Sequence, residues 1–120
     1  MKGRAEPIRL LFAEAGIDFE DKRVSYEELA ALKSTTLPFQ QVPVLIHDGF
    51  VLAQSHAIAR YVARLAGIYG NDAKEDAFSD MFDDAVMDYF VPYFDAHTDE
   101  EKKKYFEETM AKGICYLFVY

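Results

Sequence analysis

The sequence predicts an α+β protein in which a part that contains strands is followed by a part made of helices alone. Two observations support this class. In the middle of the chain, a β-prone run on each side of an Asp-Gly pair is typical of a hairpin. Beyond about residue 72, apolar residues recur only at helical spacing. Strands and helices that occupy separate parts of one chain are the pattern of α+β folds.

The first expected element is a helix from about residue 5 to residue 15. Pro7 suits the first turn of a helix, and Gly16 is placed to end it. Positions i, i+3, i+4 and i+7 give one apolar face, made of Ile8, Leu11, Phe12 and Ala15. Residues 19–24 then predict a short, partly polar strand.

A second helix is expected to begin after Ser25. This serine and Glu28 have the spacing of a capping box, so the helix should run to about Lys33. Residues 37–41 predict a loop.

The hairpin comes next. Residues 42–46 predict a strand, Asp48-Gly49 the turn, and residues 51–53 the returning strand. Ser55 is a good N-cap for the helix that follows, and Gly67 should stop that helix. Its apolar stripe consists of Ile58, Tyr61, Val62 and Leu65.

Two further helices are expected after residue 70. The first begins near Asp72 and carries an aromatic-rich stripe, and Pro92 should kink or end it. The second begins at a Thr98 capping signal and runs to about Lys112. The apolar run 114–120 at the end of the chain is an aggregation hazard if it is exposed.

Composition and charge exclude several classes of function. The chain has 120 residues and a net charge of −8, which argues against nucleic acid or an anionic membrane as the main partner. No apolar run is long enough to span a bilayer. The single cysteine, Cys115, permits no internal disulfide and fits a reducing compartment, so we expect a cytoplasmic protein. The three histidines lack metal-ligand spacing, and we expect no metal.

Four motifs, at residues 3–9, 37–39, 42–45 and 54–61, together resemble cytosolic glutathione transferases of the sigma class, including the nematode and prostaglandin-synthase-like members. The resemblance implies a thioredoxin-like domain at residues 1–69 and an all-helical domain that starts at residue 70 and includes residues 70–120. It also implies that both domains are incomplete, because the first strand and most of the helical domain have no counterpart here.

The resemblance implies a set of glutathione-binding residues. A cis Val42-Pro43 bond would hold open a main-chain edge for the cysteinyl part of the ligand. Gln54 and Ser55, at a helix start, would bind the γ-glutamyl carboxylate. The remaining implied contacts are Lys33 and Gln41 at the glycine end of glutathione, and Asp88, which would reach glutathione in the partner subunit of a homodimer.

The implied chemistry joins the glutathione thiol to a small electrophile, or isomerises a lipid peroxide, with glutathione as substrate. The family's catalytic tyrosine precedes the residues that match Met1, so no catalytic residue of the family is expected within this chain. Arg4 matches an arginine near the sulfur, where a cation favours the thiolate. The alternative is a non-catalytic glutathione-binding or structural member, or a truncated isoform.

Simpler interpretations of the same residues remain open. Pro43 could be an ordinary trans proline at the start of an edge strand. Ser55 could be a plain N-cap, and Lys33 and Gln41 could be solvated surface residues. Asp88 lies in a helix that carries several other acidic residues, so a solvated helix face would also explain it.

Overall fold

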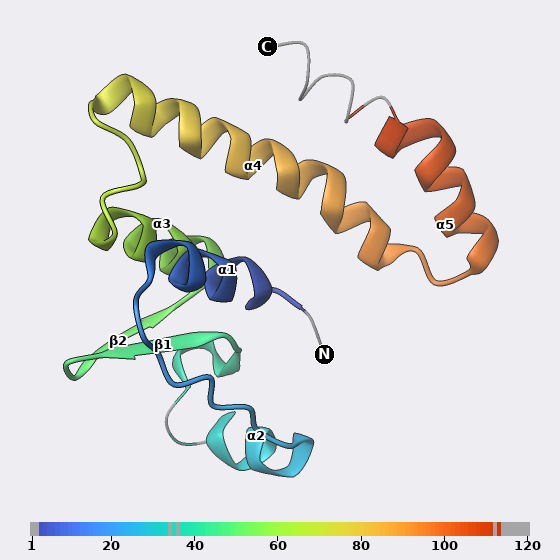
Figure 1. The fold of residues 1–120 in the computed structure, drawn as a ribbon. Coiled ribbons are helices and arrows are strands. Elements are labelled where there is room, and N and C mark those ends of the chain that lie inside the picture. The colour runs from blue at the N-terminus through green and yellow to red at the C-terminus, as the bar shows by residue number, and fades with distance from the viewer. Residues whose placement is uncertain (1–2, 34, 36, 112, 114–120) are drawn as a thin grey trace. The chain divides into compact units, whose positions relative to one another are not determined.

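The computed structural model describes residues 3–33, 35, 37–111 and 113 (Figure 1). Its internal contacts divide the chain into two units, Met1–Gly70 and Asn71–Tyr120, which are described separately. Within the described residues, the first unit contains the strands and the second contains helices only, which confirms the α+β class. Cys115 and the apolar run 114–120 lie outside the described residues.

Helix α1, Glu6–Ala15, begins and ends where the sequence predicts. Gly16 adopts the left-handed conformation, with φ of 62°, and its N–H donates to the carbonyl of Ala13. Ile8 and Phe12 are buried, which confirms the expected apolar face. This face contributes to the core of the first unit.

The prediction of a strand at residues 19–24 is wrong, because that segment forms no strand in the structure. A strand needs a neighbour to bond its backbone groups, and the sheet in the described part of the chain pairs only two other segments. Side chains hold residues 19–24 instead. Phe19 stacks on Phe12 with ring centroids 4.6 Å apart, and Asp21 forms ion pairs with Arg9 and Arg23.

Helix α2, Tyr26–Lys33, starts at the predicted capping box. The Ser25 N–H donates to the Glu28 carboxylate at 2.7 Å, and the Glu28 N–H donates to the Ser25 hydroxyl at 3.2 Å. The expected loop contains a short 3-10 helix, η1, Pro38–Gln40. Within it Gln40 has φ of 55°, a left-handed value that a residue with a side chain rarely adopts.

Strands β1, Val44–His47, and β2, Phe50–Ala53, form the predicted antiparallel hairpin. Asp48 and Gly49 turn the chain with φ of 48° and 79°, the signs that a two-residue hairpin turn requires. In Figure 1 the hairpin lies between α2 on one side and the pair of helices α1 and α3 on the other.

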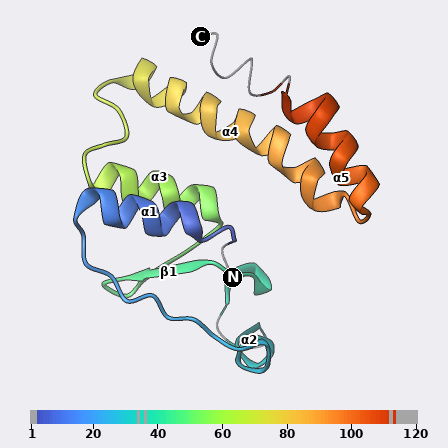
Figure 2. The same ribbon diagram turned by 45° about the vertical axis from the view of Figure 1, so that its right-hand side comes forward.

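Helix α3, Ser55–Leu65, completes the core of the first unit. Ile58 and Val62 are almost wholly buried and pack with Ile8 and Phe12. Helices α1 and α3 lie side by side in Figure 2 as in Figure 1. Leu65 departs from the predicted stripe, because 52% of it is exposed.

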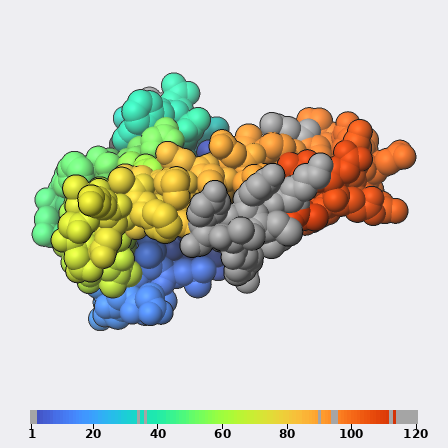
Figure 3. Space-filling model, turned by 90° about the horizontal axis from the view of Figure 1, so that it is seen from above, coloured from blue at the N-terminus to red at the C-terminus, as the bar shows by residue number. Residues whose placement is uncertain are grey.

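The second unit begins with helix α4, Ala73–Asp95, capped by the Asp72 side chain. Pro92 does not end α4 as one alternative expected, since the helix continues for three more residues. A proline removes one N–H bond, and so close to the end of a helix few later turns depend on that bond. In Figure 3 side chains of α4, coloured yellow to orange, are seen at the surface.

Helix α5, Asp99–Tyr105, follows the predicted Thr98 capping box and continues as a π-helical turn, η2, Phe106–Met110. Tyr105 is buried and its ring contacts those of Tyr93 and Phe106. None of the helices in the described part of the chain combines the length and the apolar character needed to cross a membrane.

Candidate functional site

Five of the residues implied by the resemblance gather at the open end of the hairpin. Val44 pairs with Ala53, the last pair of the ladder before the strands separate. Gln41, Val42 and Pro43 lead into β1 from this end, while Gln54 and Ser55 leave it after β2. Strand pairing therefore brings together two segments that are about a dozen residues apart in the sequence.

The Val42-Pro43 peptide bond is cis, as predicted. Val42 is 49% exposed and Pro43 is half-buried. An exposed main chain just before a strand can offer an N–H and a C=O to an extended peptide, as in strand addition. The resemblance implied this cis geometry, whereas the local sequence alone also allowed an ordinary trans proline.

Gln54 forms a single-residue corner between β2 and α3. Its backbone has φ of 73° and ψ of 115°, and its side chain makes no capping hydrogen bond. The side-chain amide instead donates to the Gln41 side chain over 3.4 Å, so two predicted site residues lie against one another. The sequence predicted Ser55 as the N-cap; the structure places Gln54 there and makes Ser55 the first helical residue.

The N-terminus of α3 can accept an anion. The first turn of an α-helix leaves N–H groups that have no acceptor within the helix, and the helix dipole favours negative charge there. The first turn of α3 carries no acidic residue, and a basic residue, Arg64, lies in its last turn. Half-buried Ser55 adds a hydroxyl at the same point. This arrangement suits a carboxylate.

Three predicted site residues are not among these five. Lys33 ends α2 and Arg4 precedes α1, and both are exposed. Within the part of the chain that the structure describes, no hydrogen bond or ion pair joins either of them to the five residues at the hairpin. Asp88 is exposed on α4 in the second unit, and its predicted role across a subunit interface stays a prediction.

Sequence reasoning missed two polar arrangements in the first unit. Hydrogen bonds from Arg23 and then Arg9 hold the pKa of Asp21 below its ordinary value, and the bond to Asp21 raises the pKa of Arg9. The second arrangement joins His47 of β1 to Tyr61 of α3, with 2.7 Å between Nδ1 and the hydroxyl oxygen. Neither arrangement has a local sequence signal, because the partners are up to 14 residues apart.

Among residues 3–33, 35, 37–111 and 113, no group of three or more His, Cys, Asp or Glu side chains is placed to hold an ion.

Comparison with known proteins gives a consistent result. The profile of the glutathione S-transferase N-terminal domain matches residues 1–64. A curated Caenorhabditis elegans protein, probable glutathione S-transferase 8, is 54% identical over 76 residues, which are 63% of this chain and 36% of the relative. The chain thus matches about a third of the length of that relative.

Solved structures extend the similarity into the second unit. A nematode-specific Caenorhabditis elegans GST has a TM-score of 0.77 at 42% identity, covering 87% of this chain and 55% of the other. A Nu-class GST from Haemonchus contortus has a TM-score of 0.72 at 43% identity, covering 77% of this chain and 45% of the other.

Proposed function

The chain belongs to the glutathione S-transferase family, and from this premise we propose that the protein joins the thiol sulfur of glutathione to small electrophiles. The carbon–sulfur bond forms as the leaving group departs with its electron pair, and the thiol proton passes to solvent. Isomerisation of lipid peroxides would use the same activated sulfur. The names of the relatives favour a transferase over the non-catalytic alternative.

This proposal rests mainly on one observation. The cis Val42-Pro43 segment and the N-terminus of α3 lie next to each other at the open end of the hairpin. Glutathione is a peptide with carboxylates at both ends. The main chain of Val42 would pair with its cysteinyl part, and Gln54 and Ser55 would bind the γ-glutamyl carboxylate. One ligand would then connect both segments at the open end of the hairpin.

Three more residues would complete the site. The Lys33 ammonium would pair with the carboxylate at the glycine end, and Gln41 would donate a hydrogen bond to it. The Arg4 guanidinium would lie near the sulfur and favour the thiolate, since an ordinary thiol with a pKa near 8.5 is mostly protonated at neutral pH. Asp88 would act in a homodimer, on glutathione bound to the partner subunit.

The class and the setting of the enzyme are also part of the proposal. The four motifs favour the sigma class, while the similarity to a Nu-class structure makes that class the competitor. A cytoplasmic location fits a chain with a single cysteine, and detoxification would follow from the conjugation of electrophiles. Glutathione-dependent isomerisation of a lipid peroxide, assayed beside conjugation, would support the sigma assignment; conjugation alone would favour the competitor.

Calorimetric titration of the chain with glutathione tests the function itself, together with an absorbance assay of conjugation to an aryl halide. We expect saturable binding, and stabilisation of the first unit against heat because ligands stabilise the state that binds them. Absence of binding at millimolar glutathione would overturn the proposal.

A further inference from the structure

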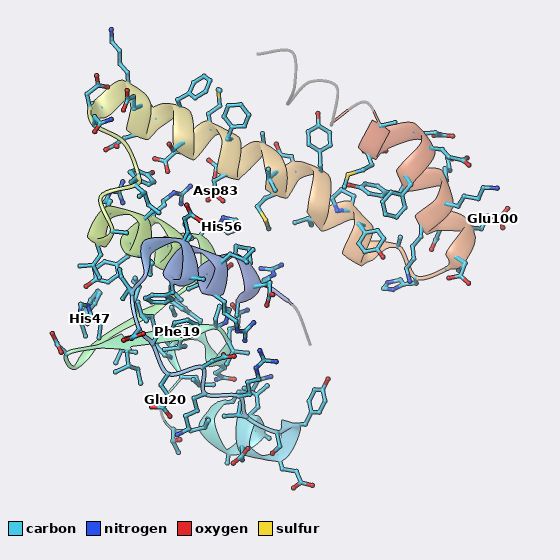
Figure 4. All side chains as sticks on the ribbon, in the orientation of Figure 1. Phe19, Glu20, His47, His56, Asp83 and Glu100 are labelled. Atoms are coloured by element: carbon cyan, nitrogen blue, oxygen red, sulfur yellow. The ribbon has the colours of Figure 1, made fainter. Side chains whose placement is uncertain are left out.

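The cross-strand pair next to the turn of the hairpin is joined to α3 by a polar contact. His47 and Phe50 face one another across the strands, next to the turn. The Tyr61 ring of α3 contacts both of them, with centroids 5.9 Å from His47 and 5.7 Å from Phe50. The Tyr61 hydroxyl lies 2.7 Å from His47 Nδ1, a short hydrogen bond. Figure 4 shows His47 at the turn end of the hairpin.

The chemistry of the three side chains is consistent with this bond. A neutral imidazole carries a proton on one nitrogen, and a tyrosine hydroxyl donates to the other. The Asp48 carboxylate lies 3.6 Å from His47 Nε2, too far for a hydrogen bond, yet near enough to favour the tautomer with its proton on Nε2. Nδ1 is then the acceptor for Tyr61. The ring of Tyr61 packs against the apolar core, so the hydroxyl is presented from a supported side chain.

Helix α3 and strand β2 diverge from Gln54, and the Tyr61–His47 hydrogen bond joins them farther out. The three form a triangle with Gln54 at one corner and the two elements as its arms. One arm is α3, along which Tyr61 lies about 10 Å from the corner at the rise of an α-helix. The other arm is β2, along which Phe50 lies about 13 Å from the corner. A corner made of one residue leaves the angle between the arms to be fixed by contacts farther out. The apolar contacts of Leu45 and Leu52 with the core supply one such contact, and the Tyr61–His47 hydrogen bond supplies a directional one.

The angle between the arms matters for the site. The main-chain edge at Val42 belongs to the strand arm, and the N–H groups at the start of α3 belong to the helix arm. A peptide ligand that bonds to both needs the two sets of donors aimed at one place, and hydrogen bonds weaken steeply when misaligned. We propose that Tyr61 and His47 are positioning residues, whose hydrogen bond sets the angle between the hairpin and α3 and so aligns the two halves of the glutathione site. This inference rests on the proposed function.

The test uses Tyr61→Phe in the full chain. This variant removes the hydroxyl and keeps the ring against Phe50. We expect the dissociation constant for glutathione, measured by calorimetry, to rise about three- to tenfold, as expected for misaligned rather than missing contacts. His47→Leu should give a similar loss, and His47→Asn should rescue it, because its side-chain amide can take the place of Nδ1. In a double-mutant cycle, Tyr61→Phe should add nothing to His47→Leu.

Ile17→Val is the matched control, since Ile17 packs against the same core but belongs neither to the hairpin nor to α3. If it lowers glutathione affinity as much as Tyr61→Phe does at equal loss of melting temperature, the role is merely structural and the proposal is overturned.

A second readout needs no ligand. Residual dipolar couplings of the backbone amides report the angle between the hairpin and α3 in the free protein. We expect this angle to change in Tyr61→Phe and to stay unchanged in Ile17→Val; unchanged couplings in Tyr61→Phe would overturn the positioning role. Failure of the wild-type chain to bind glutathione would contradict the proposed function instead, while the couplings would still decide the positioning role.

Discussion

Helices α3 and α4 are held in place by opposite means. Helix α3 has no side-chain cap, and it depends on Ile58 and Val62, which are 1% and 0% exposed. Helix α4 has a well-made cap at Asp72, yet none of its side chains that the structure describes is fully buried. Phe78 and Met81, on α4, are each about half exposed, at 51% and 52%.

The difference has a functional meaning. A cap occupies the N–H groups at the start of a helix with the protein's own oxygens, as Asp72 does for Lys74 and Glu75. On the proposed function, α3 receives the γ-glutamyl carboxylate at its N-terminus, so it needs another source of stability. Burial along the side of α3 supplies it and leaves the first turn available for a carboxylate.

The largest expected effect is on the buried side of α3. Ile58→Ala should lower the free energy of unfolding by about 2–5 kcal/mol, as large-to-small core changes do. Ile58→Val should lower it by about 0.5–1.5 kcal/mol. Met81→Ala on α4 should stay within about 0.5 kcal/mol, as surface changes usually do. Denaturant unfolding, followed helix by helix through amide exchange, measures each. A large loss of unfolding free energy in Met81→Ala would contradict this contrast between α3 and α4, since it would mean that α4 is covered by another surface.

The next effect concerns the uncapped end of α3. Ser55→Ala should weaken glutathione binding by about 1–2 kcal/mol, because a hydrogen bond to a charged group is lost. Ser79→Ala, a matched change in α4, should leave the affinity unchanged. Calorimetry compares the two variants. Equal glutathione affinities for Ser55→Ala and the wild type would show that Ser55 does not contribute to glutathione binding.

A smaller effect is expected where a helix depends on its cap. Thr98 accepts from the Glu101 N–H at 3.1 Å, and the Glu101 carboxylate accepts from the Thr98 N–H at 2.9 Å. Thr98→Ala should cost about 1 kcal/mol, and Thr98→Ser, which keeps the hydroxyl, much less. Faster amide exchange confined to α5 would support this expectation. An effect of equal size for both variants would instead indicate that the methyl group matters more than the cap.

Local rules predicted most helix ends and the hairpin from the sequence. Gly16, the Asp48-Gly49 turn and the Thr98 capping box act within a few residues, so their conformations could be inferred without the rest of the fold. The cis bond at Pro43 was predicted from the family resemblance rather than from local chemistry.

Features that depend on distant partners could not be predicted. Residues 19–24 have strand-like composition, but a strand forms only beside a neighbour. The left-handed corner at Gln54 is imposed by the elements on either side of it. The His47–Tyr61 bond joins residues 14 apart on a strand and a helix, and no periodicity reports such a pair. The residues of the proposed site could therefore be inferred from motifs, whereas the alignment of its two segments could not.

The smallest expected effect distinguishes capped from uncapped helices by pH. Bonds from backbone N–H groups, chiefly that of Glu75 to Asp72 and that of Thr98 to Glu101, lower the pKa of both exposed carboxyls. A group whose pKa is lowered on folding stabilises the folded state above its unfolded pKa, near 4 for Asp and Glu, and this contribution is lost as the pH falls through the lower folded value. The starts of α4 and α5 should therefore loosen below about pH 4, whereas α3, whose first turn has no acidic residue, should not. Amide exchange at pH 5 and pH 3, corrected for intrinsic rates, compares the three helices.

Glu101→Gln is the control, because it keeps an acceptor in the capping box without a titrating group and should reduce the pH dependence of α5. Equal loosening of α3 would show that acid acts on the core of the first unit rather than on the caps.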